Sequence, residues 1–183
     1  MLPGKTKIKW DKLEDQLINI IQSLKDLEPD ALAFRISDDK WSILQILQHL
    51  VLSEKLSMMY LAKKWKYSQD LPQKTLITLF RSWALLISIR SPIPLKAPAR
   101  VNVFDQDKTS VEIIREWQLI RSEMKDFLEK LPVKVFDKEL YKHPAVGKLT
   151  LDHMLEFFYA HCKRHHKQII KIIEYQRTRI GTI

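Results

Sequence analysis

A long amphipathic segment near the C-terminal end, residues 150–175, places the strongest constraint on how this chain folds. Its sequence is TLDHMLEFFYAHCKRHHKQIIKIIEY, and its apolar residues recur every three or four positions over much of its length. That spacing is typical of a helix that packs one face against a core. The residues of this apolar stripe are Leu151, Met154, Leu155, Phe158, Ile169, Ile172 and Ile173. The segment therefore predicts a long helix with one buried face.

Two histidines, His161 and His165, fall within this stripe one helical turn apart. Neutral imidazole is a good ligand for transition metals, and this spacing lets two rings approach one ion. The alternative is a pair of core histidines that bond to carbonyls, hydroxyls or water. A pair without the glutamate of an HExxH motif favours that alternative. A metal site therefore requires a third ligand from elsewhere in the chain.

The composition predicts a single all-α domain over residues 1–183. The chain has only three glycines and is 45% hydrophobic, and helix-forming residue types dominate it. Its one cysteine excludes an intramolecular disulfide framework. We find no signal peptide and no apolar run near the ~18 residues that a membrane span needs. We therefore expect a protein of the reducing cytoplasm.

Prolines and capping residues predict where the first helices begin and end. The first expected helix covers residues 10–27 and ends before Pro29. Ser42 and Gln45 form a capping-box pattern at the start of a second helix, which runs to about residue 65 and contains His49.

The second half of the chain continues this helical pattern. A shorter apolar helix, KTLITLFRSWALLISIR, ends at a long proline-rich loop, SPIPLKAPARVNVFDQD. Thr109 and Glu112 form a second capping box, for a helix through about Leu131. After a loop over residues 133–148, Thr150 caps the last helix. Four long amphipathic helices and one shorter inserted helix most simply form a four-helix bundle.

The formal charge of +9 leaves nucleic acid, an anionic membrane or an acidic small molecule open as partners. The basic residues Lys163, Arg164, Lys167 and Lys171 interleave with the apolar stripe, as on the solvated face of a helix. We find no zinc-finger or RNP-type aromatic motif. Nucleic-acid binding is therefore a minority alternative, and we expect no membrane partner.

His49 is the candidate third ligand, because it lies near the edge of the apolar stripe of its helix. The pattern alone does not show that this helix faces the last one. The segments KWSILQILQHL, KAPARVNVF and HPAVGKLTLDHMLEFFYAHCKRHHKQI resemble the DinB/YfiT-like family, whose superfamily includes bacillithiol transferases. The elements similar to that family are Trp41, His49, Leu50, His143, Pro144, Gly147, Thr150, His161, His165, Gln168 and Ile169.

This resemblance implies an up-down-down-up four-helix bundle with a divalent metal ion, Zn or Ni. The residues of this chain that match the metal ligands of the family are His49, His161 and His165. Three histidine ligands leave one position open, which is typical of a catalytic zinc site. The implied activity is that of a metal-dependent enzyme, either a thiol S-transferase or a hydrolase, acting on a small-molecule thiol or another small substrate.

The other histidines and the cysteine receive structural roles. We expect His166 at the surface or rim and His153 in solvent on the opposite side of the helix. His143, before a proline in a loop, is expected to organise the start of the last helix. Cys162 is expected to be a small buried hydrophobe and is not the fourth ligand.

No residue stands out as the general acid or base. Glu54 and Glu156 lie within about two turns of a proposed ligand, but surface or rim positions are the expected ones for both. The residue after His161 is not acidic, which disfavours peptide hydrolysis by an HExxH mechanism.

Two alternatives to an enzyme remain: a metal-binding or small-ligand-binding bundle without catalysis, and a basic nucleic-acid-binding module. A homodimer is also expected from the resemblance. The apolar helix over residues 75–89 either covers the bundle or forms the dimer face, with Phe80 and Trp83 at its centre.

Overall fold

The computed structural model describes residues 1–67, 70–91, 93 and 99–180 of the chain. Nearly all of its regular structure is helical, as the sequence predicts. In chain order the elements are α1 (Gly4–Leu24), α2 (Pro29–Ala33), α3 (Ile43–Tyr67), α4 (Leu76–Arg90), the 3-10 turn η1 (Ala99–Val101), α5 (Ser110–Lys130), the 3-10 turn η2 (Val133–Val135), the strands β1 (Tyr141–His143) and β2 (Gly147–Leu149), and α6 (Leu151–Ile180).

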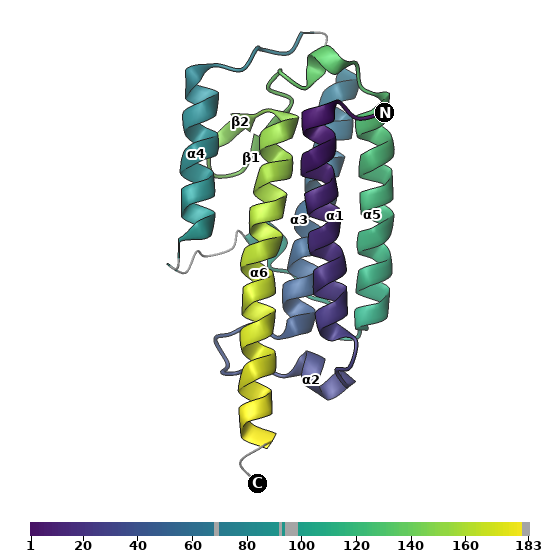
Figure 1. Cartoon of the computed structure of the whole chain (residues 1–183), viewed down its shortest axis with the longest axis vertical. Coiled ribbons are helices and arrows are strands. Elements are labelled where there is room, and N and C mark those ends of the chain that lie inside the picture. The colour runs from purple at the N-terminus through teal and green to yellow at the C-terminus, as the bar shows by residue number, and fades with distance from the viewer. Residues whose placement is uncertain (68–69, 92, 94–98, 181–183) are drawn as a thin grey trace.

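Four long helices, α1, α3, α5 and α6, form a bundle (Figure 1). The outer two in sequence, α1 and α6, run in one direction and pack side by side, whereas α3 and α5 run in the opposite direction and also pack together. This is the up-down-down-up arrangement. Because α3 and α5 are parallel, the chain must return along the bundle between them, and α4 lies on that return.

Helix capping follows the sequence signals closely. The backbone N–H of Ser42 donates to the Gln45 side chain, and the backbone N–H of Gln45 donates back to the Ser42 hydroxyl. Thr109 and Glu112 form the same reciprocal pair at the start of α5. The Thr150 hydroxyl accepts from a backbone N–H in the first turn of α6. These caps satisfy backbone donors that have no partner within the helix.

The helix α4 lies outside the four-helix bundle, against α6 and β2 (Figure 1). Thr75 and Thr78 cap its first turn reciprocally. At the other end, the Arg164 guanidinium of α6 donates to the carbonyls of Ile89 and Ser91 at 2.9 and 2.5 Å. Arg164 is therefore half-buried and not on the solvated face where the sequence places it. A cation at a helix C-terminus satisfies free carbonyls and complements the helix dipole.

Three features of the fold differ from the sequence predictions. The helix α1 begins at Gly4, six residues before the expected start, and ends at Leu24. A short helix, α2, follows it at Pro29, where only a helix end was expected. The expected loop after α5 contains an antiparallel hairpin of two three-residue strands. Much of the proline-rich loop, residues 92 and 94–98, falls outside the described residues.

One continuous apolar cluster fills the bundle between α1, α3, α5 and α6. It includes the predicted stripe of α6, all of whose residues are buried. None of the helices in the described part of the chain is both long and apolar enough to cross a membrane. The core therefore fixes the relative positions of α3 and α6, the two helices that carry the candidate metal ligands.

Candidate metal centre

The structure brings His49, His161 and His165 together inside the bundle. His49 comes from α3, and the other two come from successive turns of α6. The Nε2 atom of His161 lies 3.0 Å from that of His49 and 3.1 Å from that of His165. All three side chains are buried, and their candidate ligand atoms lie within 4.8 Å of one another. The third ligand that a metal site requires is therefore His49, on a helix separated from α6 by more than half of the chain.

The outer ring nitrogens show how two of these histidines are oriented. The Nδ1 of His49 lies 2.9 Å from the Val101 carbonyl, and that of His165 lies 2.7 Å from the Gln168 side-chain oxygen. Both neighbours are acceptors, so each neutral ring carries its proton on Nδ1. The Nε2 atoms of His49 and His165 then both present lone pairs to the third ring.

These lone pairs cannot all be satisfied by the histidines themselves. His161 carries at most one proton on Nε2, so it can donate to His49 or to His165, but not to both. A cation among the three Nε2 atoms satisfies every lone pair at once. Ligands at 2.0 to 2.1 Å from one tetrahedral zinc ion lie about 3.3 Å apart, close to the spacing seen here. The donor set therefore fits a divalent metal ion.

Aromatic side chains surround the cluster and restrict the ring orientations. The Trp41 ring lies 4.9 Å from that of His49 and stacks on that of His165 at 6.1 Å. On the other side, Phe157 stacks on His161 with ring centroids 5.2 Å apart. These two rings shield the imidazoles from water and lower the local polarity.

Burial keeps all three imidazoles neutral near pH 7. It lowers the pKa of His49 and brings that of His161 well below its ordinary value. The same cause lowers the pKa of His165 to about 3. Neutral imidazole is the form that binds metal, so these rings do not have to lose a proton before an ion binds.

The remaining three histidines lie outside the cluster. His143 ends β1 and packs edge-on against Phe157 at 4.6 Å, which agrees with a structural role before α6. His153 is half-buried, and its buried Nδ1 has no hydrogen-bond partner in the described structure. The expectation of a solvated His153 is therefore wrong. Burial lowers the pKa of this ring, and both Lys9 of α1 and Lys74, just before α4, lie close enough to affect it.

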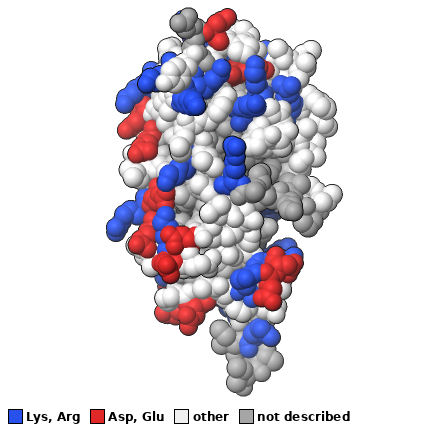
Figure 2. All heavy atoms as spheres, turned by 180° about the vertical axis from the view of Figure 1, so that it is seen from behind, with Lys and Arg blue, Asp and Glu red and all other residues white. Residues whose placement is uncertain are grey.

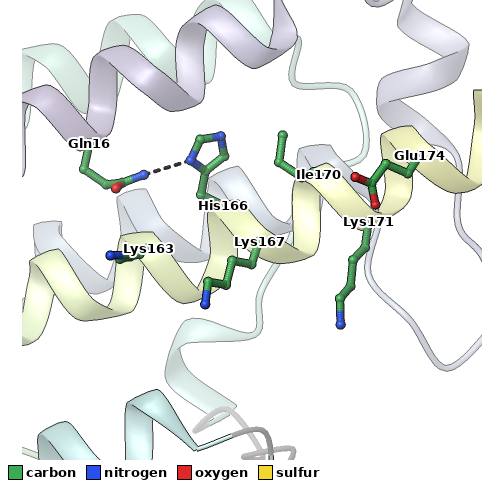
Figure 3. A pocket seen from close by; sticks show the side chains of 7 residues that line it. All are labelled: Gln16, Lys163, His166, Lys167, Ile170, Lys171 and Glu174. Carbon is green, nitrogen blue, oxygen red and sulfur yellow. Dashed lines mark hydrogen bonds between the residues drawn. The ribbon is translucent and has the colours of Figure 1, made fainter.

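His166 lines a surface pocket of about 370 Å³ between α1 and α6 (Figure 3). Its Nδ1 lies 2.9 Å from the Gln16 side-chain nitrogen, and the ring is half-buried, which is the expected rim position. The amino groups of Lys163, Lys167 and Lys171 point away from this ring in Figure 3. These three lysines are exposed, as expected for a solvated helix face.

Glu54 does not lie at the surface or rim. It is 1% exposed, and the buried Arg121 of α5 donates to both of its carboxylate oxygens. The expectation failed because it took a charged residue to be solvated, whereas a buried partner replaces water here. Glu156 stays near the surface and pairs with Lys9 at 2.9 Å. Both candidate acids are therefore bound to basic residues.

Cys162 is buried as predicted, but its neighbours are charged. The sulfur lies 3.7 Å from a Glu54 oxygen and 3.8 Å from an Arg121 nitrogen. Burial and the Glu54 carboxylate raise the pKa of the thiol well above its ordinary value. A protonated, enclosed thiol is a poor nucleophile and a poor metal ligand. Cys162 is therefore not part of the candidate metal centre.

The fold and the cluster define a helical bundle with a buried three-histidine centre contributed by two of its helices. A family model described as the DinB superfamily matches residues 12–169, which is most of the chain. The chain belongs to the DinB superfamily, as the sequence resemblance indicated. Comparison with curated proteins and comparison with solved structures each give no significant match.

Proposed function

We propose that this chain is a metal-dependent enzyme that holds Zn²⁺ or Ni²⁺ through His49, His161 and His165 and transfers a small thiol to an electrophile. The observation that carries the proposal is the convergence of three Nε2 atoms, with the central one 3.0 and 3.1 Å from its neighbours. Membership of the DinB superfamily supports the same site. We place the activity in the cytoplasm, because the chain has a single cysteine, which is not in a disulfide.

The residues around the cluster preorganise it. The Val101 carbonyl and the Gln168 side chain orient two of the rings, and Trp41 packs against the same two rings. When bound, a divalent ion with an open position lowers the pKa of a coordinated water or thiol. Three neutral imidazoles leave the full positive charge of such an ion in place, which favours an anionic sulfur beside it.

The surroundings of the site favour thiol transfer over hydrolysis. Hydrolysis by a metal-activated water usually uses a carboxylate as general base, and among the described residues Glu54 and Glu156 are both held in ion pairs. In thiol transfer the sulfur loses its proton to solvent and forms a bond to the electrophilic carbon. The bond from that carbon to the leaving group breaks, and the electron pair departs with the leaving group.

The test begins with the metal content of protein purified without a metal-affinity column. We expect about one Zn or Ni per chain by elemental analysis, lost in His49→Ala and in His165→Ala. The matched control is His166→Ala, which removes the neighbouring histidine outside the cluster and should keep its metal. Full metal occupancy in either ligand variant, with the helical circular dichroism spectrum unchanged, contradicts the assignment.

A second candidate function is metal binding without catalysis. This alternative is favoured because Glu54 and Glu156, the two candidate general bases, are both held in ion pairs, with Arg121 and Lys9. The metal-loaded protein should then show no turnover with low-molecular-weight thiols paired with aryl halides or epoxides, or with labile esters. Metal-dependent turnover of a thiol with any of these electrophiles, lost in His165→Ala, supports the transferase. Turnover of esters alone supports a hydrolase.

A further inference from the structure

The β1–β2 hairpin, which packs against α4, presents two unneutralised positive charges to solvent. Lys142 of β1 and Lys148 of β2 are direct cross-strand partners, and both are exposed. Their neighbours Tyr141 and Leu149 are buried, so the two lysines lie on the outer face of the hairpin. Like charges directly opposite each other destabilise a strand pair. An anion bound over this pair would remove that repulsion.

The helix beside the hairpin adds positive charge and no negative charge. It has no acidic residue, and with about 100° between successive residues Arg81 and Arg90 fall on opposite flanks of its outer face. Two carboxylates close to the hairpin in the chain are already engaged, since Asp137 pairs with Lys74 and the buried Glu139 accepts from Thr78. Among the described residues, no carboxylate pairs with Arg81, Arg90, Lys142 or Lys148.

Between these cations, the outer face of α4 is apolar. Six of its large side chains are exposed, by 46% to 83%, and they include the neighbouring rings of Phe80 and Trp83. At about 150 to 250 Å² for each large side chain, they expose an apolar area on the order of 700 Å². The largest patch on a typical monomer is about 300 to 600 Å². The residues of this face are Leu76, Ile77, Leu79, Phe80, Trp83 and Ile87.

This helix is held rigidly against the bundle while its apolar face stays outside. Thr75 and Thr78 cap its first turn, and Arg164 binds the carbonyls of Ile89 and Ser91 at its end. Seen from behind, the α5 edge of the molecule carries mixed blue and red residues, whereas the α4 edge is mostly white (Figure 2). A helix with an exposed apolar face that includes Trp and Phe, flanked by cations, is typical of helices that lie in a membrane interface.

Charge distinguishes between the surfaces that could cover this face. A second copy of the chain, related by a twofold axis, would bring its own Arg81, Arg90, Lys142 and Lys148 to the same interface. The two sets of cations would repel each other. An anionic bilayer offers an apolar layer and negative headgroups together, so it is complementary to both parts of the surface.

We propose that the outer face of α4 docks on the surface of an anionic lipid bilayer. The helix lies in the plane of the membrane, with Phe80 and Trp83 between the headgroups and the acyl chains, where aromatic rings are enriched. Arg81 and Arg90 extend from the flanks toward headgroup phosphates, and Lys142 and Lys148 contact the same layer. The sequence led us to expect no membrane partner because it has no spanning segment, but a helix that lies in the interface needs none.

Co-flotation of the full chain with lipid vesicles tests this proposal. We expect binding to mixed phosphatidylcholine and phosphatidylglycerol, and binding at least about tenfold weaker to phosphatidylcholine alone. Phe80→Glu/Trp83→Glu should weaken binding to the mixed vesicles at least about tenfold, because it places carboxylates in the apolar contact. The matched control is Val111→Glu/Leu119→Glu, which places the same charges on exposed apolar positions of α5 and should bind like the wild type.

A second pair of substitutions tests the contribution of the hairpin. Lys142→Gln/Lys148→Gln leaves the apolar face intact and should weaken binding to the mixed vesicles about tenfold, with little change on phosphatidylcholine alone. All the variants should keep the helical circular dichroism spectrum of the wild type.

Three results would overturn the proposal. The first is no binding of the wild type to the mixed vesicles, and the second is equal binding to both kinds of vesicle. The third is binding that persists in Phe80→Glu/Trp83→Glu. Sedimentation equilibrium identifies the competing occupant: a dimer that is lost in this variant, in a chain that does not bind vesicles, assigns the face to a second copy.

Discussion

Arg121 donates hydrogen bonds to both carboxylate oxygens of Glu54 at the centre of the bundle, and its Nη2 lies 2.7 Å from one of them. Both residues are 1% exposed. The same guanidinium reaches the Leu13 carbonyl at 3.2 Å and the Glu14 carboxylate at 2.8 Å. With Cys162 of α6 at 3.8 Å, this one side chain of α5 contacts the other three long helices. Burial alone would lower the pKa of Arg121, but Glu54 outweighs it and the pKa is raised.

Breaking this pair from one side is expected to be strongly destabilising. Arg121→Met leaves the Glu54 carboxylate buried without a counter-charge, which costs about 3 to 5 kcal/mol. Replacing both residues, as in Glu54→Gln/Arg121→Met, removes the unpaired charge and should recover most of that loss. Urea denaturation of the wild type and the two variants measures the free energy of unfolding.

The matched control for this prediction is Lys125→Met, an exposed basic residue one turn further along α5. It should change the free energy of unfolding by less than about 0.5 kcal/mol. If Arg121→Met is as mild as Lys125→Met, the guanidinium does not stabilise the bundle as its contacts indicate.

The sequence predicted best where one local signal decides the structure. The pairs Ser42–Gln45 and Thr109–Glu112 form the expected caps, since a capping box depends on residues three positions apart. The inward direction of His161 and His165 follows from helical periodicity alone. The approach of His49 does not, because it depends on how α3 packs against α6. The resemblance to the DinB/YfiT-like family implies that His49 lies beside His161, and the structure shows this contact.

Long-range pairing explains most of what the sequence reading missed. Glu54 lies among buried residues of α3, as Arg121 does in α5, so each interrupts an apolar stripe with a charge. A buried acidic residue on one helix and a buried basic residue on another suggest an ion pair. The spacing of residues within each helix, however, does not show that Glu54 and Arg121 are in contact. The β1–β2 hairpin is too short to show strand alternation, with three residues in each strand.

A second prediction concerns Gln168, which orients His165. Gln168→Leu removes the acceptor 2.7 Å from Nδ1, so the ring loses the contact that fixes its proton and its direction. We expect metal affinity to fall about 10- to 100-fold. Gln168→Glu keeps an acceptor and should retain the affinity. Competition titrations with a chromogenic zinc chelator measure both variants.

The control for Gln168 is Gln118→Leu, the same change at an exposed position of α5. It should leave the metal affinity at the wild-type value. Equal affinities for Gln168→Leu and Gln118→Leu would show that the hydrogen bond to His165 does not tune the site.

Gly147 provides a third prediction, about the hairpin that leads into α6. It is the first residue of β2 and has φ +85°, a conformation that side chains with a Cβ rarely adopt. Gly147→Ala should lower the free energy of unfolding by about 1 kcal/mol or more. Gly4→Ala is the matched control, because a Cβ there meets nothing within 4 Å and the residue is helical. Thermal unfolding should show a lower Tm for the first variant only.

The fourth prediction concerns the pH dependence of stability and His143. Burial lowers the pKa of this ring in the folded protein from 6.5 to about 4. Between these two values the unfolded chain binds a proton that the folded chain does not. The free energy of unfolding therefore falls as the pH falls from about 6.5 to about 4, and this contribution is fully present above pH 6.5.

Replacing His143 by a residue that does not titrate should reduce this loss. His143→Asn keeps a side-chain acceptor for the backbone N–H of Ala145, which lies 3.2 Å from Nδ1 in the wild type. The variant is expected to lose less stability between pH 7 and pH 4 than the wild type, by on the order of 2 kcal/mol after allowance for partial exposure. Urea titrations at each pH, with a chelator present so that both proteins are metal-free, give the two curves. Parallel curves would mean that the His143 ring takes up a proton as easily in the folded protein as in the unfolded chain, against the burial that packs it on Phe157.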